Sequence, residues 1–321
     1  MADAAIDYGD FNYSTGNKII LQYVADYVVA ATRNRGNPIR YFTNVSNTVA
    51  RQGDVARVQV TATPDSISIS DGETRTLNNT VDTTVDITMS TLRQSCWGVT
   101  DMADLLSGGV ENESLFAGRW TGLMNNIESD FMAQFVSGST TNVVGTYGSA
   151  ITEANVSLLA ADIIAQKPPR ERNSLHLFVS PTGFSQISQI TNYNAGSVRG
   201  YLPGEPAPSM DEDYGENSRP WHNFMIHQCT SLTAPTVSGT VQTNNVAAHT
   251  GSVAIAMRPL TSGDFGGADG YIAVPFMDAE AGIAGSVVYA KNFLTFAKEV
   301  SVRCLYGFGI VKEPWTGLLK S

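Results

Sequence analysis

Residues 53–97 contain two segments in which apolar and polar side chains alternate. The segments span residues 55–62 and 81–89, and many of their apolar residues are β-branched. A period of two predicts β-strands with one covered face. The stretch at 64–72 is too rich in serine and aspartate to form a core, so we expect the two strands to form a long hairpin arm. A hairpin this long cannot bury its own apolar face, and we expect it to lie on a neighbouring copy of the protein.

A helical pattern follows over residues 111–136. Apolar side chains recur there every three or four positions, at Phe116, Trp120, Leu123, Ile127, Phe131 and Phe135. This spacing predicts an amphipathic helix of about seven turns. Gly118 and Gly122 should each weaken the helix by about 1 kcal/mol relative to alanine. We therefore expect a packed strand or helix to approach the helix backbone closely at these glycines.

Residues 150–285 alternate between helical and strand patterns, which predicts a second, more compact unit. We expect Thr152 to cap a helix that ends near residue 166, and Pro181 to begin another helix after a buried strand at 175–179. Two stretches are expected to be surface loops. Residues 203–220 are proline-rich and acidic and predict a long exposed loop, and residues 230–250 are polar without a helical period and predict a β-rich excursion on the surface.

The two ends of the chain have different patterns. Residues 1–16 are rich in tyrosine, aspartate and glycine and predict an extended arm, and residues 17–32 have a helical period. Residues 285–311 predict long strands with a turn near Lys291. A short helix or turn is expected at 101–109.

Composition narrows the possible functions. The chain has 321 residues, a net charge of −10 and 16% charged residues. A nucleic-acid grip needs clustered lysine and arginine, so we expect contact with DNA, if any, to lack sequence specificity. The first ten residues have no signal-peptide pattern, and no apolar run approaches membrane-spanning length, so we expect synthesis in a cytoplasm and no membrane contact. The three cysteines, Cys96, Cys229 and Cys304, are widely spaced and are expected to be free, buried thiols.

Few residues could take part in catalysis or metal binding. His222, His227 and Cys229 are close in sequence, but residues five apart on a strand face opposite ways, which leaves too few ligands for a zinc site. Asp101 and Asp104 suit helix capping, and the acidic cluster at 211–213 suits a solvated loop. No nucleophile elbow, dinucleotide loop or phosphate loop is present. We expect no catalytic residue, no metal and no cofactor. The candidates for contacts between subunits are Ile67 and Ile69 at the polar tip, with Arg57 and Arg75.

The order of these patterns, and three local sequences, resemble the major capsid proteins of tailed bacteriophages, which have the Hong-Kong-ninety-seven phage fold. The segment at 175–181 (LHLFVSP) is similar to the family's strand-to-helix step, and those at 293–299 and 305–314 are similar to its closing strands. The resemblance implies an α+β fold with four parts. These are an N-terminal arm (1–49), an extended loop (50–97), a peripheral domain with the long spine helix (98–149 and 286–321) and a compact axial domain (150–285).

The resemblance also implies a function and partners. The chain would self-assemble into pentamers and hexamers of an icosahedral shell around double-stranded DNA, as part of a virion assembled in the host cytoplasm. Expected partners are further copies of the chain, a separate scaffolding protein, a portal protein at one vertex and a possible decoration protein. No lysine lies between Lys18 and Lys167, so the extended loop cannot supply a lysine for a covalent cross-link between subunits.

Three alternatives remain open at this point. An encapsulin-like compartment shell shares the fold but would need a groove for cargo peptides. A β-rich hydrolase would need a converging acid–base pair, which the sequence does not supply. A tail-tube or decoration protein would lack a long amphipathic helix beside a long hairpin.

Overall fold

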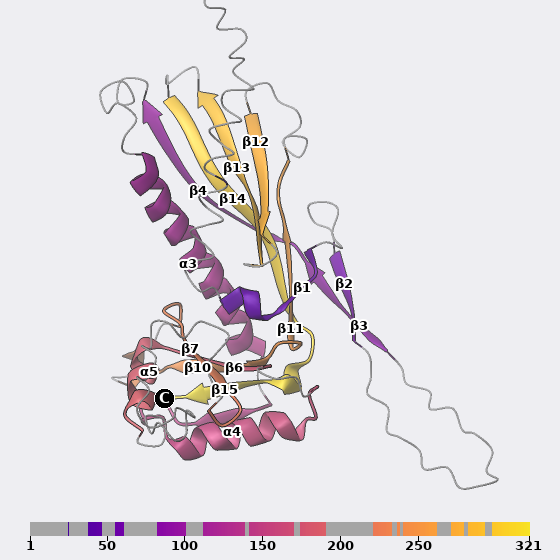
Figure 1. Ribbon diagram of the computed structural model, residues 1–321, viewed down its shortest axis with the longest axis vertical. Helices are drawn as coiled ribbons and strands as arrows, with labels where there is room; N and C mark the ends of the chain where they lie inside the picture. Colours follow the sequence, from indigo (N-terminus) through magenta and orange to yellow (C-terminus); the bar gives the residue numbers. More distant parts are fainter. Residues whose placement is uncertain are drawn as a thin grey trace, which may run out of the picture.

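The computed structural model describes residues 25, 38–46, 55–60, 82–100, 112–138, 141–169, 174–190, 221–232, 236–237, 240–261, 271–278, 282–292 and 297–321. Within these residues the chain forms an elongated upper sheet and a compact lower unit, with a long helix running beside the upper sheet and ending at the lower unit (Figure 1). The expected α+β class is confirmed.

The upper sheet has six strands, in which β14 (Ala297–Ile310) is central. Its first part pairs with β4 (Thr91–Thr100) on one side and β13 (Ile283–Asn292) on the other, and its second part pairs with β11 (Val253–Arg258). The outer strands are β12 (Tyr271–Asp278), beside β13, and β1 (Thr43–Asn44), parallel to β11. The predicted long strands with a turn near Lys291 are confirmed.

The lower sheet has five strands in the order β5-β15-β10-β6-β7. The strands are β5 (Val143–Gly145), β6 (Leu175–Val179), β7 (Met225–Gln228), β10 (Asn244–His249) and β15 (Thr316–Lys320). Alternate residues of its strands enter two different cores. Phe178 and Val246 face the core that contains the long helix, whereas Leu177 and Ala247 face the core formed with the two helices of the lower unit. Because both faces are covered, apolar residues follow one another in the centres of β6, β10 and β15 instead of alternating with polar ones.

Two helices cover the second face of the lower sheet: α4 (Glu153–Ala165) and α5 (Pro181–Ser188). Both begin as the sequence predicts. The Thr152 hydroxyl accepts a hydrogen bond from the Asn155 N–H, and the Ser180 hydroxyl accepts one from the Gly183 N–H, with Pro181 in the first turn. None of the helices in the described part of the chain is both long and apolar enough to cross a membrane.

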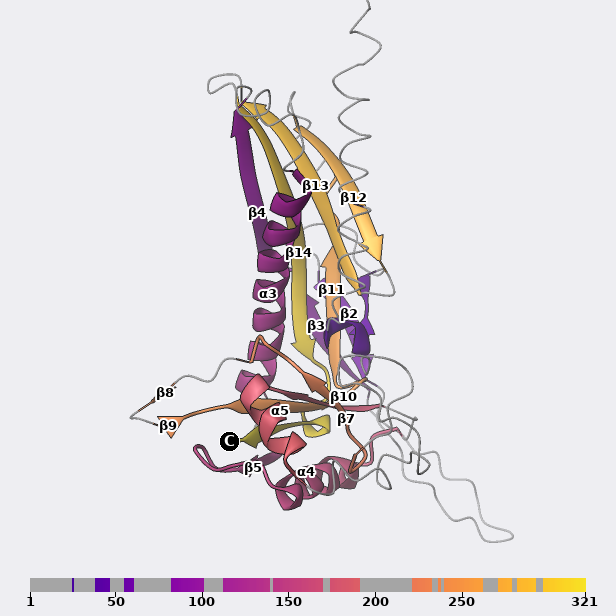
Figure 2. The same ribbon diagram turned by 60° about the vertical axis from the view of Figure 1, so that its left-hand side comes forward.

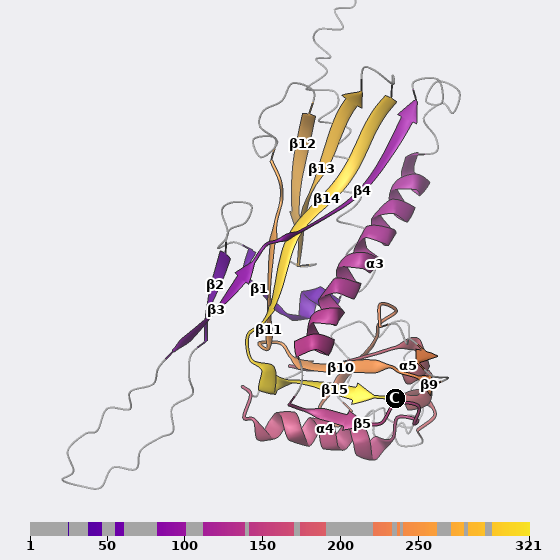
Figure 3. The ribbon, with the colours of Figure 1, turned by 180° about the vertical axis from the view of Figure 1, so that it is seen from behind.

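The long helix α3 (Asn112–Gly138) confirms the predicted amphipathic helix. Its apolar stripe is buried from Trp120 to Phe135, and the helix contacts β4 and β14 of the upper sheet as well as β10 and β15 of the lower one (Figure 3). Hydrogen bonds also fix it to the upper sheet. The Arg93 guanidinium on β4 donates to both Asp130 carboxylate oxygens at 2.7 and 2.8 Å, and the Tyr306 hydroxyl on β14 donates to the same carboxylate.

The sheets divide the chain differently from the expected boundaries. The extended loop was expected to reach residue 97, but β4 begins at Thr91 and belongs to the upper sheet. Residues 253–285, expected in the compact unit, supply β11 and β12 to the upper sheet, and β15, expected with the closing strands, pairs with β10 in the lower one. Apolar runs reveal strands, but they carry no information about which sheet a strand joins.

The β-rich character expected of residues 230–250 is confirmed, but their expected surface location is wrong for the second half. Residues 244–249 form β10, where Val246, Ala247 and Ala248 are fully buried between β6 and β15. Small alanines in a strand covered on both faces give no alternation, so the pattern did not indicate that this strand is buried. The short strands β8 (Thr236–Val237) and β9 (Thr240–Val241) do project from the lower unit (Figure 2).

Several expectations concern residues outside the described part of the chain. These are the short element at 101–109 and the loop at 203–220. Of the expected helix at 17–32, the structure describes Ala25, which is helical and buried.

Candidate inter-subunit surface

A two-stranded hairpin projects from the upper sheet, away from α3 (Figures 1 and 3). Its strands are β2 (Val55–Val60) and β3 (Thr83–Thr88), which pair antiparallel with Val58 opposite Val85. This confirms the hairpin pairing that the alternation predicts.

The base of the hairpin packs on the chain's own upper sheet. Ala56 and Ile87 are almost fully buried in a cluster with Ala254 and Leu305. The hairpin approaches β14 so closely that a Cβ atom at Gly307 would press on the Thr88 carbonyl oxygen. The prediction that the hairpin needs another subunit to cover its apolar face is therefore wrong for this base. It remains a prediction for the residues beyond it.

The solvent-facing side of the hairpin carries charged and polar pairs. Arg57 Nε donates to Asp86 Oδ1 at 2.9 Å, directly across the two strands, and Gln59 donates to Asp82 at 2.8 Å. The Arg57 guanidinium lowers the pKa of Asp86. The Arg57 and Asp86 side chains are 68% and 49% exposed, so water screens the pair and it adds little to stability. These groups can instead contact another molecule.

The other predicted contact residues cannot be placed. Ile67, Ile69 and Arg75 lie outside the described residues, and Arg57 is the one of the four whose position is known. Its partner Asp86 was not predicted. The correct register of the two strands places these opposite charges directly across from each other, so it would have revealed the pair.

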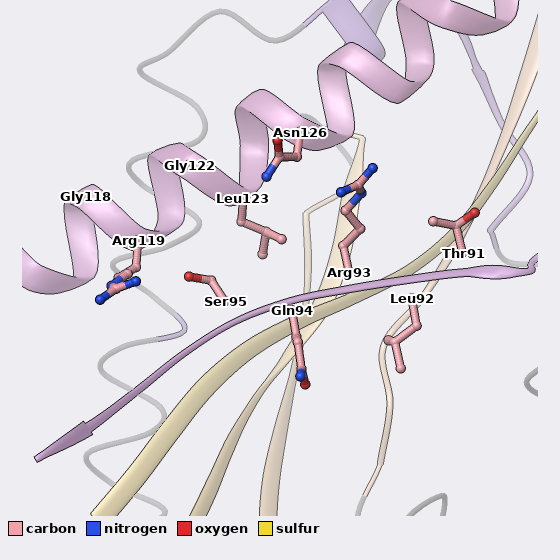
Figure 4. Close-up of a pocket in the computed structure, with 10 residues that line it drawn as sticks. All are labelled: Thr91, Leu92, Arg93, Gln94, Ser95, Gly118, Arg119, Gly122, Leu123 and Asn126. Carbon is pink, nitrogen blue, oxygen red and sulfur yellow. The ribbon is translucent and has the colours of Figure 1, made fainter.

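A groove of about 490 Å³ lies between α3 and β4 (Figure 4). Residues of β4 form one wall, and Arg119, Asn126 and Leu123 of α3 are on the other. Leu92 is 43% exposed beside it. The residues that line the groove include two leucines, Leu92 and Leu123, and two arginines, Arg93 and Arg119.

Gly118 and Gly122 lie on the helix side of this groove. A Cβ atom at either position would meet no atom within 4 Å, so no element of the described chain approaches the helix there. The expected close contact at these glycines is wrong for a contact with the described part of the chain. Each glycine lies two positions from a residue of the apolar stripe, so the helical period places both on the opposite face of α3.

The histidines do not form a metal site. Among the described residues, no three histidine, cysteine or acidic side chains are placed to hold a metal ion. His222 Nε2 lies 3.0 Å from Glu153 Oε1 on α4, whereas His227 lies within β7 and bonds to His176 on β6. The sequence correctly separates His222 from His227 but misses His176, which lies 51 positions before His227 and meets it only through strand pairing. Of the cysteines, Cys229 and Cys304 are buried as expected, but Cys96 is exposed.

Known proteins match this chain in structure and not in sequence. No family model matches the chain, and no curated protein matches it in sequence. Solved structures do match over nearly the whole chain. A capsid chain of the cyanophage P-SCSP1u is 12% identical with a TM-score of 0.55, covering 87% of this chain and 86% of its own. A chain from Mycobacterium phage Che8 is 14% identical with a TM-score of 0.53, covering 87% and 89%.

The chain has the fold of phage major capsid proteins. The match covers 87% of the chain, and the fold is the one that the resemblance in the sequence implied. The capsid fold is also present in a virus-like particle from Pyrococcus furiosus, whose chain is 10% identical with a TM-score of 0.50, covering 94% of this chain and 99% of its own.

Proposed function

We propose that this chain is the major structural subunit of an icosahedral shell that encloses double-stranded DNA. The observation that carries the proposal is the capsid fold over nearly the whole chain, including a hairpin that projects from the body. A structural role also fits the partly buried pair of Arg93 with Asp130, which holds α3 on the upper sheet.

In this proposal the upper sheet with α3 is the peripheral domain and the lower sheet with α4 and α5 is the axial domain. Copies join through heterologous contacts into pentamers and hexamers, with axial domains meeting at the centre of each ring. The outer part of the hairpin, with Arg57, Ile67, Ile69 and Arg75, contacts the neighbouring subunit. Many weak contacts made at once hold the shell together.

The proposed partners follow from this role. A separate scaffolding protein guides assembly, a portal protein occupies one vertex, and a decoration protein can bind outside. The packaged DNA is held without sequence-specific contacts, because a chain with net charge −10 repels a polyanion and does not grip it. The assembled protein is part of a virion formed in the host cytoplasm.

Negative-stain microscopy of the native assembly tests the proposed function. We expect closed shells of uniform size with a dense interior, and DNA that nuclease cannot digest until the shells are opened. If the chain recovered from the cells that produce it stays monomeric at every concentration measured, the proposal is contradicted.

The hairpin contact is tested by charge exchange. Arg57→Asp removes both the Arg57–Asp86 pair and any contact with a neighbour, whereas the double variant Arg57→Asp/Asp86→Arg keeps an internal pair with reversed direction. We expect both variants to fold and both to lower the yield of shells, since neither presents a cation at position 57. Full recovery of shells by the double variant would limit Arg57 to an internal role.

The tip residues are tested separately. Ile67→Asp/Ile69→Asp should leave the monomer folded, as judged by circular dichroism, and reduce shell formation. Ser66→Asp/Ser68→Asp is the matched control, because it adds the same charge to the same stretch of sequence and keeps both isoleucines. An equal loss in both pairs of variants would show that charge, and not the apolar contact, is responsible.

A compartment shell that encloses proteins is the second candidate function. The match to the virus-like particle from Pyrococcus furiosus supports a closed shell, whatever its content. The two candidates differ in content: native particles whose interior holds one enriched protein and no nuclease-protected DNA would favour the compartment.

A further inference from the structure

Two buried histidines lie where an N-terminal segment meets the lower sheet. His176 on β6 and His227 on β7 are 4% and 5% exposed, and His176 Nδ1 lies 3.0 Å from His227 Nε2. The short helix η1 (Pro38–Tyr41) covers them. The Tyr41 ring lies 4.6 Å from the His176 ring and 4.5 Å from the His227 ring, measured between centroids.

The segment that carries Tyr41 joins several parts of the molecule. The next residue, Phe42, packs on Phe131 and Phe135 of α3, and the following strand β1 pairs with β11 of the upper sheet. Residues 38–44 therefore connect the lower sheet, the long helix and the upper sheet. Release of η1 from the histidines would loosen the join between the two sheets.

The hydrogen bond between the imidazoles requires at least one of the two facing nitrogens to lack a proton. In the neutral pair, one ring donates and the other accepts. When both rings are protonated, both nitrogens become donors and neither can accept. The bond is then lost, and two cations remain buried against each other.

Charged and titratable groups on three elements surround the pair. On η1, Arg40 donates to the Tyr41 hydroxyl at 2.7 Å, and its positive charge increases the cost of protonating both imidazoles. On β10, His249 donates to the Pro169 carbonyl oxygen and accepts from the Gly251 N–H, and a positive charge there opposes protonation of His176. On α3, the buried Glu128 carboxylate, of the opposite sign, accepts a hydrogen bond from Ser231 and lies near Cys229, which follows β7.

We propose that His176 and His227 form an acid-sensitive latch, which holds residues 38–41 on the lower sheet while the imidazoles are neutral and releases them when both are protonated. The latch is a property of the single chain and does not depend on the proposed function.

Burial, helped by the nearby positive groups, lowers the pKa of His176 to about 4 and that of His227 to about 3. In the opened segment both return towards the ordinary value of 6.5. Because the closed-state pKa values lie below the open-state values, the latch has its full stability above pH 6.5. It loses stability as the pH falls from there towards 4.

Hydrogen–deuterium exchange of the full chain at pH 7 and pH 5 tests the latch, read from the peptide that contains residues 38–46 and corrected for intrinsic exchange rates. Most carboxylates stay ionised at pH 5. We expect the opened population to rise by up to about 500-fold between these pH values when two histidines are released, and about 25-fold when one is. A peptide from the centre of β14 should not change.

Amide variants separate titration from packing. His176→Asn and His227→Gln place an amide near the position of each bonding nitrogen and cannot be protonated. We expect each single variant to reduce the pH response to about 25-fold and the double variant to abolish it. His222→Gln, outside the cluster, should keep the full response. If the double variant does not fold, the unaltered chain and the two single variants still decide the question. Equal exchange of residues 38–46 at pH 7 and pH 5 in the unaltered chain would overturn the proposal, and so would an undiminished response in both single variants.

Discussion

Asp130 accepts hydrogen bonds from two residues that are far from it in sequence. Arg93 on β4 binds both carboxylate oxygens, and Tyr306 on β14 binds one of them. Burial and the adjacent carboxylate raise the pKa of Tyr306, so its hydroxyl remains a donor throughout the neutral range. The three side chains together fix the rotation of α3 on the upper sheet.

Asp130→Ala should lower the free energy of unfolding by about 1–3 kcal/mol, because a charged and a neutral donor lose their acceptor. We expect the lower part of this range, since the Asp130 side chain is 30% exposed and water can replace some of the lost bonds. Urea denaturation of the unassembled chain measures the change. Asp86→Ala, in the exposed pair on the hairpin, is the control and should leave the urea midpoint unchanged. A midpoint unchanged in Asp130→Ala as well would mean that this network does not stabilise the helix.

The cysteines should differ sharply in reactivity. Burial raises the pKa of Cys229 to about 11 and that of Cys304 to about 12, whereas Cys96 is exposed on β4. A disulfide reagent at pH 8 should therefore modify one thiol per folded chain and three after unfolding, because thiolates are the reactive form. Cys96→Ser should reduce the first value to zero. Rapid modification of a second thiol in the folded chain would show that one of the two buried sites opens easily.

At the scale of elements, α3 contains two glycines that lower the stability of the helix. Glycine inside a helix costs up to about 1 kcal/mol relative to alanine, and Gly118 and Gly122 have open space where a methyl group would lie. Gly118→Ala/Gly122→Ala should therefore raise the free energy of unfolding of the unassembled chain by up to about 2 kcal/mol. Thermal unfolding checks this. Gly307→Ala is the matched contrast and should destabilise the chain, because its new methyl group would press on the Thr88 carbonyl at the base of the hairpin.

The same element illustrates what a sequence can and cannot predict. The 3.6-residue period gave the position of α3 and the buried stripe from Trp120 to Phe135, because period and burial are both local. The same period places Gly118 opposite this stripe, so its open surroundings could have been predicted as well, whereas the approach of β4 to the neighbouring face is a non-local fact. The pairing of His176 with His227 was missed for the same reason.

The two sheets differ in how well they could be predicted. The hairpin has a covered and an open side, so alternation identified it. In β10 both faces are covered and two central residues are alanines, so nothing distinguished a buried strand from one on the surface. The crossing of the C-terminus from β14 into β15 of the other sheet was likewise not predicted. Lys312, Glu313 and Pro314 interrupt the apolar run there, but an interruption does not tell which sheet the next strand joins.

At the scale of the whole molecule, the chain is elongated, with a projecting hairpin (Figures 1 and 2). A groove lies between α3 and β4. Only 16% of its residues are charged. An assembly of such subunits relies on the number of its contacts, and each contact can be weak and reversible. Reversibility lets errors in assembly dissociate before the shell closes.

We predict that the assembled shell is held together without covalent bonds between chains. A side-chain cross-link through the hairpin would need a lysine amine there, and the sequence has no lysine between Lys18 and Lys167. Intact particles boiled in detergent and reductant should migrate as a single band near 34.4 kDa. Urea should dissociate the particles into monomers. The urea concentration at which half of the particles dissociate should rise with the total protein concentration, as expected of a reversible assembly. A ladder of multiples of the chain mass would contradict the prediction and would require a cross-link that starts from a lysine outside the hairpin.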